Sequence, residues 1–171
     1  MVADLMPFRQ SQLREASAVN AAQSGDGSSS AWPRFVTAYA LVITRIEERL
    51  KAAGLPELTW YDVLWALERA PRGRLRMHEL AENTVISRSN LTRLVDRLEA
   101  ASLVARDRDC SDRRGAFAVL TTTGRAVRRR MWTVYGPAIG ELFDGHLNAA
   151  ETLQMRSILD RILQAARAHG P

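Results

Sequence analysis

Side chains suited to hydrogen bonding with a nucleic acid are concentrated in one short segment, Ser87–Arg97. Around this segment, apolar residues recur at the spacing of a helix that buries one face: Leu91, Leu94, Val95 and Leu98. The opposite face of that helix then carries serine, asparagine, threonine and arginine, which read base edges or hold phosphates in duplex DNA. An ordinary solvated helix face is the alternative interpretation. The residues that the pattern assigns to DNA contact are Ser87, Arg88, Ser89, Asn90, Thr92, Arg93 and Arg97.

A second polar group lies at the tip of a predicted β-hairpin that follows this helix. Residues 103–107 and 116–120 have the composition of two short strands, and the turn between them is rich in arginine. Arginines on such a hairpin can reach a minor groove or its phosphates beside the groove that the helix occupies. Three arginines are expected to make these contacts and one aspartate to orient them: Arg108, Arg113, Arg114 and Asp112. A charged loop that is polar only for solubility is the alternative interpretation.

The same tip contains Cys110, the single cysteine of the sequence. One cysteine excludes an internal disulfide and a zinc site built from several cysteines. The nearby arginines would lower the pKa of this thiol, so a redox switch is one interpretation. A thiol without a redox role is the interpretation that we favour.

The polar face requires a helix-turn-helix to present it. A short helix is predicted over 77–83 and a second over 87–100, and the second helix of this motif enters the major groove with its N-terminal end. Upstream, Trp32 and Pro33 are predicted to begin a helix that ends at Gly54. Thr59, with Asp62 three residues later, is predicted to cap the next helix.

Two further helices are predicted after the hairpin. A long helix follows Thr121 and is expected to be interrupted at Gly136-Pro137, because proline lacks the backbone donor. Asn148 with Glu151 is predicted to begin the last helix. That helix carries more apolar residues than a surface helix needs: Met155, Ile158, Leu159, Ile162, Leu163 and Ala166. The surplus indicates a dimer interface.

The charge distribution agrees with a polyanion-binding module in the middle of the chain. The 171 residues have a net charge of +5, and residues 72–130 contain fourteen arginines and seven acids. The flanks are therefore slightly acidic, and the basic charge is gathered in the central third. Charge alone leaves a solvated charged surface as an equal alternative.

Composition limits the class of protein further. Hydrophobic residues make up 46% of the chain and charged residues 25%, as in a globular domain with a core. No apolar stretch reaches the ~18 residues that span a bilayer and no signal pattern is present, so a cytoplasmic protein without membrane contact is expected. The three histidines lack metal-ligand spacing, so neither a metal nor a cofactor is predicted. Phosphate-binding glycine loops, nucleophile elbows and paired carboxylates are missing too, and no enzyme is expected.

Two ordered motifs resemble the MarR family of regulators. Leu80-Ala81-Glu82, Ser87–Glu99 and Leu103-Val104 are similar to the central segment of that family. Residues 112–121, with Gly124 beyond them, are similar to its D-x-R-x(5)-L-T signature, in which Asp112 and Arg114 would be the paired aspartate and arginine. The resemblance covers about residues 33–168.

The resemblance implies a mainly α fold, a winged helix-turn-helix with a small β-hairpin wing, flanked by N- and C-terminal dimerisation helices. Residues 1–31 would be a flexible arm and 32–171 the MarR-type domain. Within that domain, 57–121 would form the winged helix-turn-helix, and 32–54 and 122–169 the helices that interlock two subunits. Each subunit of the homodimer would then bind one half of a palindromic operator.

Large aromatic residues occur on helices that flank a cleft in this fold, between the DNA-binding part and the dimer helices. The candidate ligand cleft consists of Tyr39, Trp60, Trp65 and Trp132. A small aromatic or lipophilic effector could bind there, although such aromatics more often form plain core. Oxidant-sensing members place a cysteine in or near the first helix, and this sequence has none there.

The expected function is that of a sequence-specific transcriptional regulator of duplex DNA, a repressor released by a small-molecule effector. A protein-interaction scaffold without specific DNA binding is the rival, because winged helices also bind proteins. Salt-dependent binding to duplex DNA distinguishes the two functions.

Overall fold

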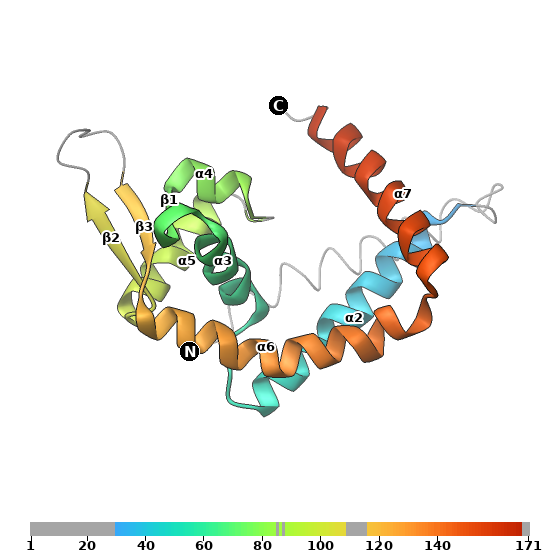
Figure 1. Cartoon of the computed structure of the whole chain (residues 1–171), viewed down its shortest axis with the longest axis horizontal. Helices are drawn as coiled ribbons and strands as arrows, with labels where there is room; N and C mark the ends of the chain where they lie inside the picture. Colours follow the sequence, from blue (N-terminus) through green and yellow to red (C-terminus); the bar gives the residue numbers. More distant parts are fainter. Residues whose placement is uncertain (1–29, 85, 87, 109–115, 169–171) are drawn as a thin grey trace. The chain divides into compact units, whose positions relative to one another are not determined.

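The computed structural model describes residues 30–84, 86, 88–108 and 116–168. Its elements, labelled in Figure 1, are α2 (Trp32–Ala52), α3 (Leu58–Arg69), η2 (Pro71–Gly73), β1 (Arg74–Arg76), α4 (Met77–Glu82), α5 (Arg88–Ala100), β2 (Val104–Arg108), β3 (Ala116–Leu120), α6 (Thr122–Leu142), η3 (Asp144–His146) and α7 (Ala149–Ala168). The chain divides into two compact units, Met1–Ile43 and Thr44–Pro171, with the boundary inside α2. None of the described helices is long and apolar enough to cross a membrane.

The core of the second unit joins α3, α4 and α5 to the small sheet. It contains the four apolar residues of α5 that the sequence assigned to a buried face, together with residues of the neighbouring elements: Val63, Leu64, Leu67, Leu80, Leu91, Leu94, Val95, Leu98, Leu103, Val104, Ala118 and Leu120. In Figure 1 the three helices gather beside the strands, and β2 and β3 extend away from them. The predicted mainly α winged helix-turn-helix is confirmed.

The sheet has three strands, one more than the predicted hairpin. Its order is β1-β3-β2, and all pairs are antiparallel. Strand β1 escaped prediction because it is three residues long, Arg-Leu-Arg, and offers a single apolar residue, Leu75. Pairing of Leu75 with Ala118 of β3 creates this strand, so it depends on a partner more than 40 residues away in the chain.

The predicted capping residue of α3, Thr59, is wrong. The helix begins at Leu58, and Thr59 lies in its first turn, so Thr59 is not the capping residue. The backbone N–H of Leu58 instead donates to Oε1 of Glu47 in α2, at 3.0 Å. A carboxylate from another helix satisfies this helix end, and a cap of that kind leaves no local signature in the sequence.

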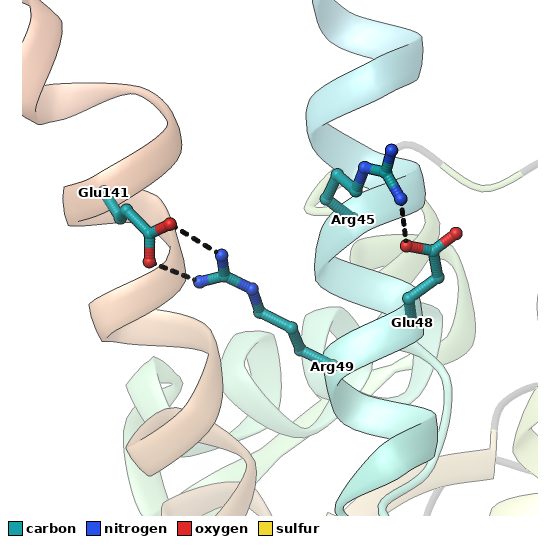
Figure 2. Close-up of polar contacts among 4 residues, drawn as sticks. All are labelled: Arg45, Glu48, Arg49 and Glu141. Atoms are coloured by element: carbon teal, nitrogen blue, oxygen red, sulfur yellow. Dashed lines mark hydrogen bonds and ion pairs between the residues drawn. The ribbon is translucent and has the colours of Figure 1, made fainter.

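Helix α6 is continuous, which corrects the predicted interruption at Gly136-Pro137. It runs from Thr122 to Leu142 with Pro137 inside it. Beyond the proline, Glu141 accepts two hydrogen bonds from Arg49 of α2, at 2.8 and 2.9 Å (Figure 2). This exposed bidentate pair joins the last turn of α6 to α2.

Helix α7 begins as predicted. The side chain of Asn148 accepts from the backbone N–H of Glu151 at 3.0 Å, and the carboxylate of Glu151 accepts from the backbone N–H of Asn148 at 2.8 Å. The two residues form a reciprocal capping box, which confirms this sequence prediction.

The start of α6 makes a close backbone contact with Leu103, the residue that precedes β2. Thr121 is the N-cap of α6: its hydroxyl accepts from the N–H of Gly124 at 2.9 Å and donates to the carbonyl of Leu103 at 3.0 Å. A Cβ on Gly124 would lie 2.1 Å from that same carbonyl oxygen. Glycine at 124 therefore permits the contact that joins the sheet to α6.

Gly124→Ala should lower the free energy of unfolding by about 2 kcal/mol or more, because backbone must move to admit the methyl group. Gly140→Ala is the matched control in the same helix. A Cβ at 140 meets nothing within 4 Å, so this change should raise stability by about 0.5–1 kcal/mol. Urea unfolding followed by circular dichroism measures both variants, and an equal effect at the two positions would contradict the contact.

Candidate nucleic-acid interface

The polar face of α5 is exposed as the helical spacing predicts. Leu91, Leu94, Val95 and Leu98 are buried against α3, α4 and the sheet. The exposed side chains on the other side of the helix include Ser89, Asn90, Thr92 and Arg93. Packing of the apolar stripe thus determines which side of α5 faces outward, and this orientation confirms the predicted face.

Arg93 stands out on this face because no acid holds it within the described part of the chain. The one acid near it in sequence, Asp96, pairs with Arg106 of β2 instead. Arg106 also lies 3.6 Å from Glu99. The base of the wing therefore neutralises two carboxylates of α5 that would repel a phosphate backbone.

Arg97 takes a different place from the other predicted DNA contacts. Its guanidinium lies 2.7 Å from Oε1 of Glu57 and 5.4 Å from the centre of the Trp60 ring. Glu57 also accepts a hydrogen bond from the indole of Trp60 at 3.2 Å. These contacts join the end of α5 to the start of α3, and they separate Arg97 from Arg93.

Most predicted contacts of the wing lie outside the described residues. These are Asp112, Arg113 and Arg114, together with Cys110 and, before α5, Ser87. Arg88 is the first residue of α5 and Arg108 the last of β2, and only their backbones are described. Their roles in DNA binding stay predictions.

The outer side of the sheet carries an arginine cluster that the sequence analysis did not identify. The guanidinium carbons of Arg74 and Arg76 lie 4.6 and 4.8 Å from the centre of the Phe117 ring. Register explains the cluster, because Arg76 pairs directly with Phe117, and residues two apart on β1 share one side. No signal in the sequence reveals it while β1 remains unrecognised.

Two of the four residues of the predicted ligand cleft, Trp65 and Trp132, belong to one aromatic cluster. Trp65 and Trp132 stack on Tyr61, with ring centres 6.3 and 6.1 Å away, and Tyr135 meets Tyr61 edge-on at 5.0 Å. Trp60 instead packs with Arg97, as described above. Tyr39 belongs to the first compact unit. The central member, Tyr61, is buried and was absent from the prediction.

An ionic cluster borders these aromatics between α3 and α6. Glu68 of α3 lies 2.9 Å from Arg125 and 2.5 Å from Arg128, both on α6. The side chains of Glu68 and Arg128 are only 14% and 13% exposed. Arg128 also hydrogen-bonds Tyr61 and lies 5.1 Å from the centre of the Trp65 ring. The sequence does not reveal this cluster, because Glu68 is more than 50 residues from its partners on α6.

The fold and the exposed face of α5 define a winged helix-turn-helix protein. The family model of the MarR family matches residues 48–115. A comparison with curated protein sequences gives no match.

Solved structures of MarR family transcriptional regulators are similar along most of the chain. AbsC from Streptomyces coelicolor is 30% identical, with 85% of this chain and 97% of AbsC covered at a TM-score of 0.78. Sco3205 from the same organism, solved in complex with DNA, is 31% identical, with 82% and 86% covered at a TM-score of 0.73. BpsR from Bordetella bronchiseptica, whose DNA binding is regulated by 6-hydroxynicotinic acid, shares the fold at 23% identity, with 77% and 97% covered and a TM-score of 0.68.

The chain therefore belongs to the MarR family of transcriptional regulators. This membership makes it a DNA-binding regulator and confirms the family that the two sequence motifs indicated.

The buried hydroxyl of Tyr61 gives the α3–α6 contact a pH dependence. Burial raises the pKa of Tyr61, and the hydrogen bond from Arg128 partly opposes that rise. The folded state thus binds the hydroxyl proton of Tyr61 more tightly than the unfolded chain does. In the unfolded chain a tyrosine ionises at about pH 10. Its stabilising effect should be present below that pH and be lost as the pH rises through the folded pKa.

Tyr61→Phe removes this proton, so the stability advantage of the wild type over the variant should be constant up to about pH 10 and shrink as the pH rises further. Urea unfolding at a series of pH values measures the difference in free energy of unfolding between wild type and variant. The contributions of the other titrating groups cancel in this difference. An advantage that grows with pH would mean that Arg128 outweighs burial.

Proposed function

We propose that the protein is a sequence-specific repressor that binds a palindromic operator as a homodimer and is released by a small-molecule effector. The observation that carries the proposal is the outward face of α5, where Arg93 has no acidic partner among the described residues and Asp96 is neutralised by Arg106. Such a face can enter the major groove and donate to base edges. The 31% identical Sco3205 was solved bound to DNA, which supports this use of the fold.

We assign direct contact with bases and phosphates to the N-terminal part of α5 and to the wing. The assigned residues are Ser87, Arg88, Ser89, Asn90, Thr92, Arg93, Arg108, Arg113 and Arg114, with Asp112 orienting the wing arginines. Arg97 is assigned a smaller part, because Glu57 and Trp60 already hold its guanidinium. No catalytic group is needed for this function, and a role on chromosomal DNA places the protein in the cytoplasm.

Dimerisation is supported by apolar side chains that each compact unit leaves exposed. In the first unit these include Trp32, Phe35 and Tyr39, at 68%, 50% and 58% exposure. In α7, Ile162 and Leu163 are 57% and 50% exposed, and no described residue of that helix is buried. Several large apolar side chains exposed on one helix indicate a surface for a protein partner. A second copy is the partner that a twofold operator requires.

An effector site is supported by the aromatic cluster on α3 and α6. Trp65 and Trp132 are 40% and 47% exposed, so they present apolar ring surface to solvent. Arg69 and Arg128 lie 5.8 and 5.1 Å from the centre of the Trp65 ring. We propose that a small aromatic or lipophilic molecule binds these rings and weakens DNA binding.

Selection from a random-sequence duplex library tests the function directly. The full chain should enrich duplexes with two inverted copies of one half-site, and binding should weaken steeply as salt increases. Salt-dependent binding to duplexes without enrichment of any sequence would overturn the proposal of sequence-specific regulation. A chain that binds no duplex at all would support the interaction scaffold.

Arg93→Ala tests whether α5 reads bases. A bidentate base contact contributes about 1–3 kcal/mol of discrimination, whereas a phosphate contact is lost equally on all sequences. The variant should therefore lose about 1–3 kcal/mol more on the selected duplex than on a scrambled one, as measured by fluorescence anisotropy. Arg45→Ala, at an exposed arginine outside the helix-turn-helix, is the control. Equal losses on both duplexes would make Arg93 a phosphate contact.

Ile162→Asp tests the dimer. At micromolar concentration the wild type should be a dimer and the variant a monomer. A carboxylate on the apolar stripe of α7 would be a buried charge without a partner in the dimer, which is strongly unfavourable. Gln164→Glu adds a charge on the opposite side of the same helix and should leave the dimer intact. Light scattering coupled to size exclusion gives both masses, and a wild-type monomer would contradict the proposal.

A further inference from the structure

The ion pair between Glu68 and Arg128 is enclosed to a degree unusual for charged side chains. Oε2 of Glu68 and Nε of Arg128 are 2.5 Å apart, and both atoms are buried. The contact is an ion pair, and neither atom has a hydrogen-bond partner in the described part of the chain. By comparison, the pair between Arg45 and Glu48 has side chains that are 63% and 56% exposed.

Enclosure gives this pair a directional effect that apolar packing lacks. Apolar surfaces of α3 and α6 could slide past one another and still exclude water, but separated charges here would each be left without a partner. Arg128 adds a hydrogen bond to Tyr61 and a contact with the Trp65 ring, both on α3. Three residues on one side of α3 therefore hold a single side chain of α6 and define one register of the two helices.

The location of this register makes it relevant to DNA. Helix α3 contributes Val63, Leu64 and Leu67 to the core that carries α5. Helix α6 leads away from that core, and its far end is held by Arg49 of α2 through Glu141 (Figure 2). The angle at which the DNA-reading helix is presented is thus set where α3 meets α6.

We infer that Glu68 and Arg128 are positioning residues that set the distance and rotation between the two half-sites that the regulator accepts. The inference rests on the proposed homodimer and its twofold operator. One added base pair between half-sites rotates them by about 34° and separates them by about 3.4 Å. A rigid α3–α6 register tolerates no such change, whereas a loose register does.

Wild type and variants select duplexes from the same random-sequence library, and the base pairs between enriched half-sites are counted. Glu68→Gln removes the charge at nearly constant shape. The double variant Glu68→Met with Arg128→Met replaces the pair by apolar side chains, which keeps the contact packed and avoids an unpaired buried charge. Glu48→Gln removes an exposed ion pair and is the matched control. Thermal unfolding verifies that each variant is folded.

Wild type and the control should enrich one spacing, and respacing by one base pair should weaken binding about tenfold, comparable to a mismatched base pair. Both pair variants should enrich the same half-site sequence at several spacings, with less than about a threefold penalty for respacing. A folded double variant that keeps the single wild-type spacing would overturn this inference and leave the proposed function intact. A wild type that enriches no paired half-sites overturns the proposed function and the inference with it.

Discussion

The ion pairs of Glu68 with α6 are the interactions on which the packing of α3 against α6 depends most. A largely buried negative charge must be neutralised locally, and Arg125 and Arg128 of α6 do so at 2.9 and 2.5 Å. Replacing such a pair by apolar residues is often harmless to stability, while removing one partner is costly, about 3–5 kcal/mol. The pair therefore contributes a defined geometry more than a favourable free energy. In the proposed dimer, which would have to match two half-sites, this defined geometry is the property that matters.

Helix α3 connects the parts of the second unit because each of its ends is held by a different element. Glu47 of α2 caps its first turn, and Glu57 beside that turn binds Arg97 of α5. At its other end, Glu68 binds α6, and the apolar side between the ends enters the core. A displacement of α3 would thus be transmitted to the reading helix. The exposed Trp65, which belongs to the proposed effector site, lies on this same helix.

Residues outside α5 neutralise acidic side chains of that helix. Asp96 and Glu99 would oppose a phosphate backbone, but Arg106 on the adjacent strand engages both. Arg97 pairs with Glu57, so among the described side chains of α5 Arg93 is an exposed arginine without an acidic partner. The charge of the exposed α5 face is thus set in part by Arg106 and Glu57, which lie outside that helix.

The sequence by itself determined what depends on local periodicity and local caps. The stripe from Leu91 to Leu98 predicted the orientation of α5, and Asn148 with Glu151 predicted the start of α7, because both signals lie within a few residues. The tertiary structure alone decided whatever needs a distant partner. Strand β1 exists through pairing with Ala118, α3 is capped by Glu47, and α6 continues through Pro137 with Glu141 held by Arg49. The cluster at Glu68 belongs to this second group, since residues more than 50 positions apart become neighbours only when α3 packs on α6.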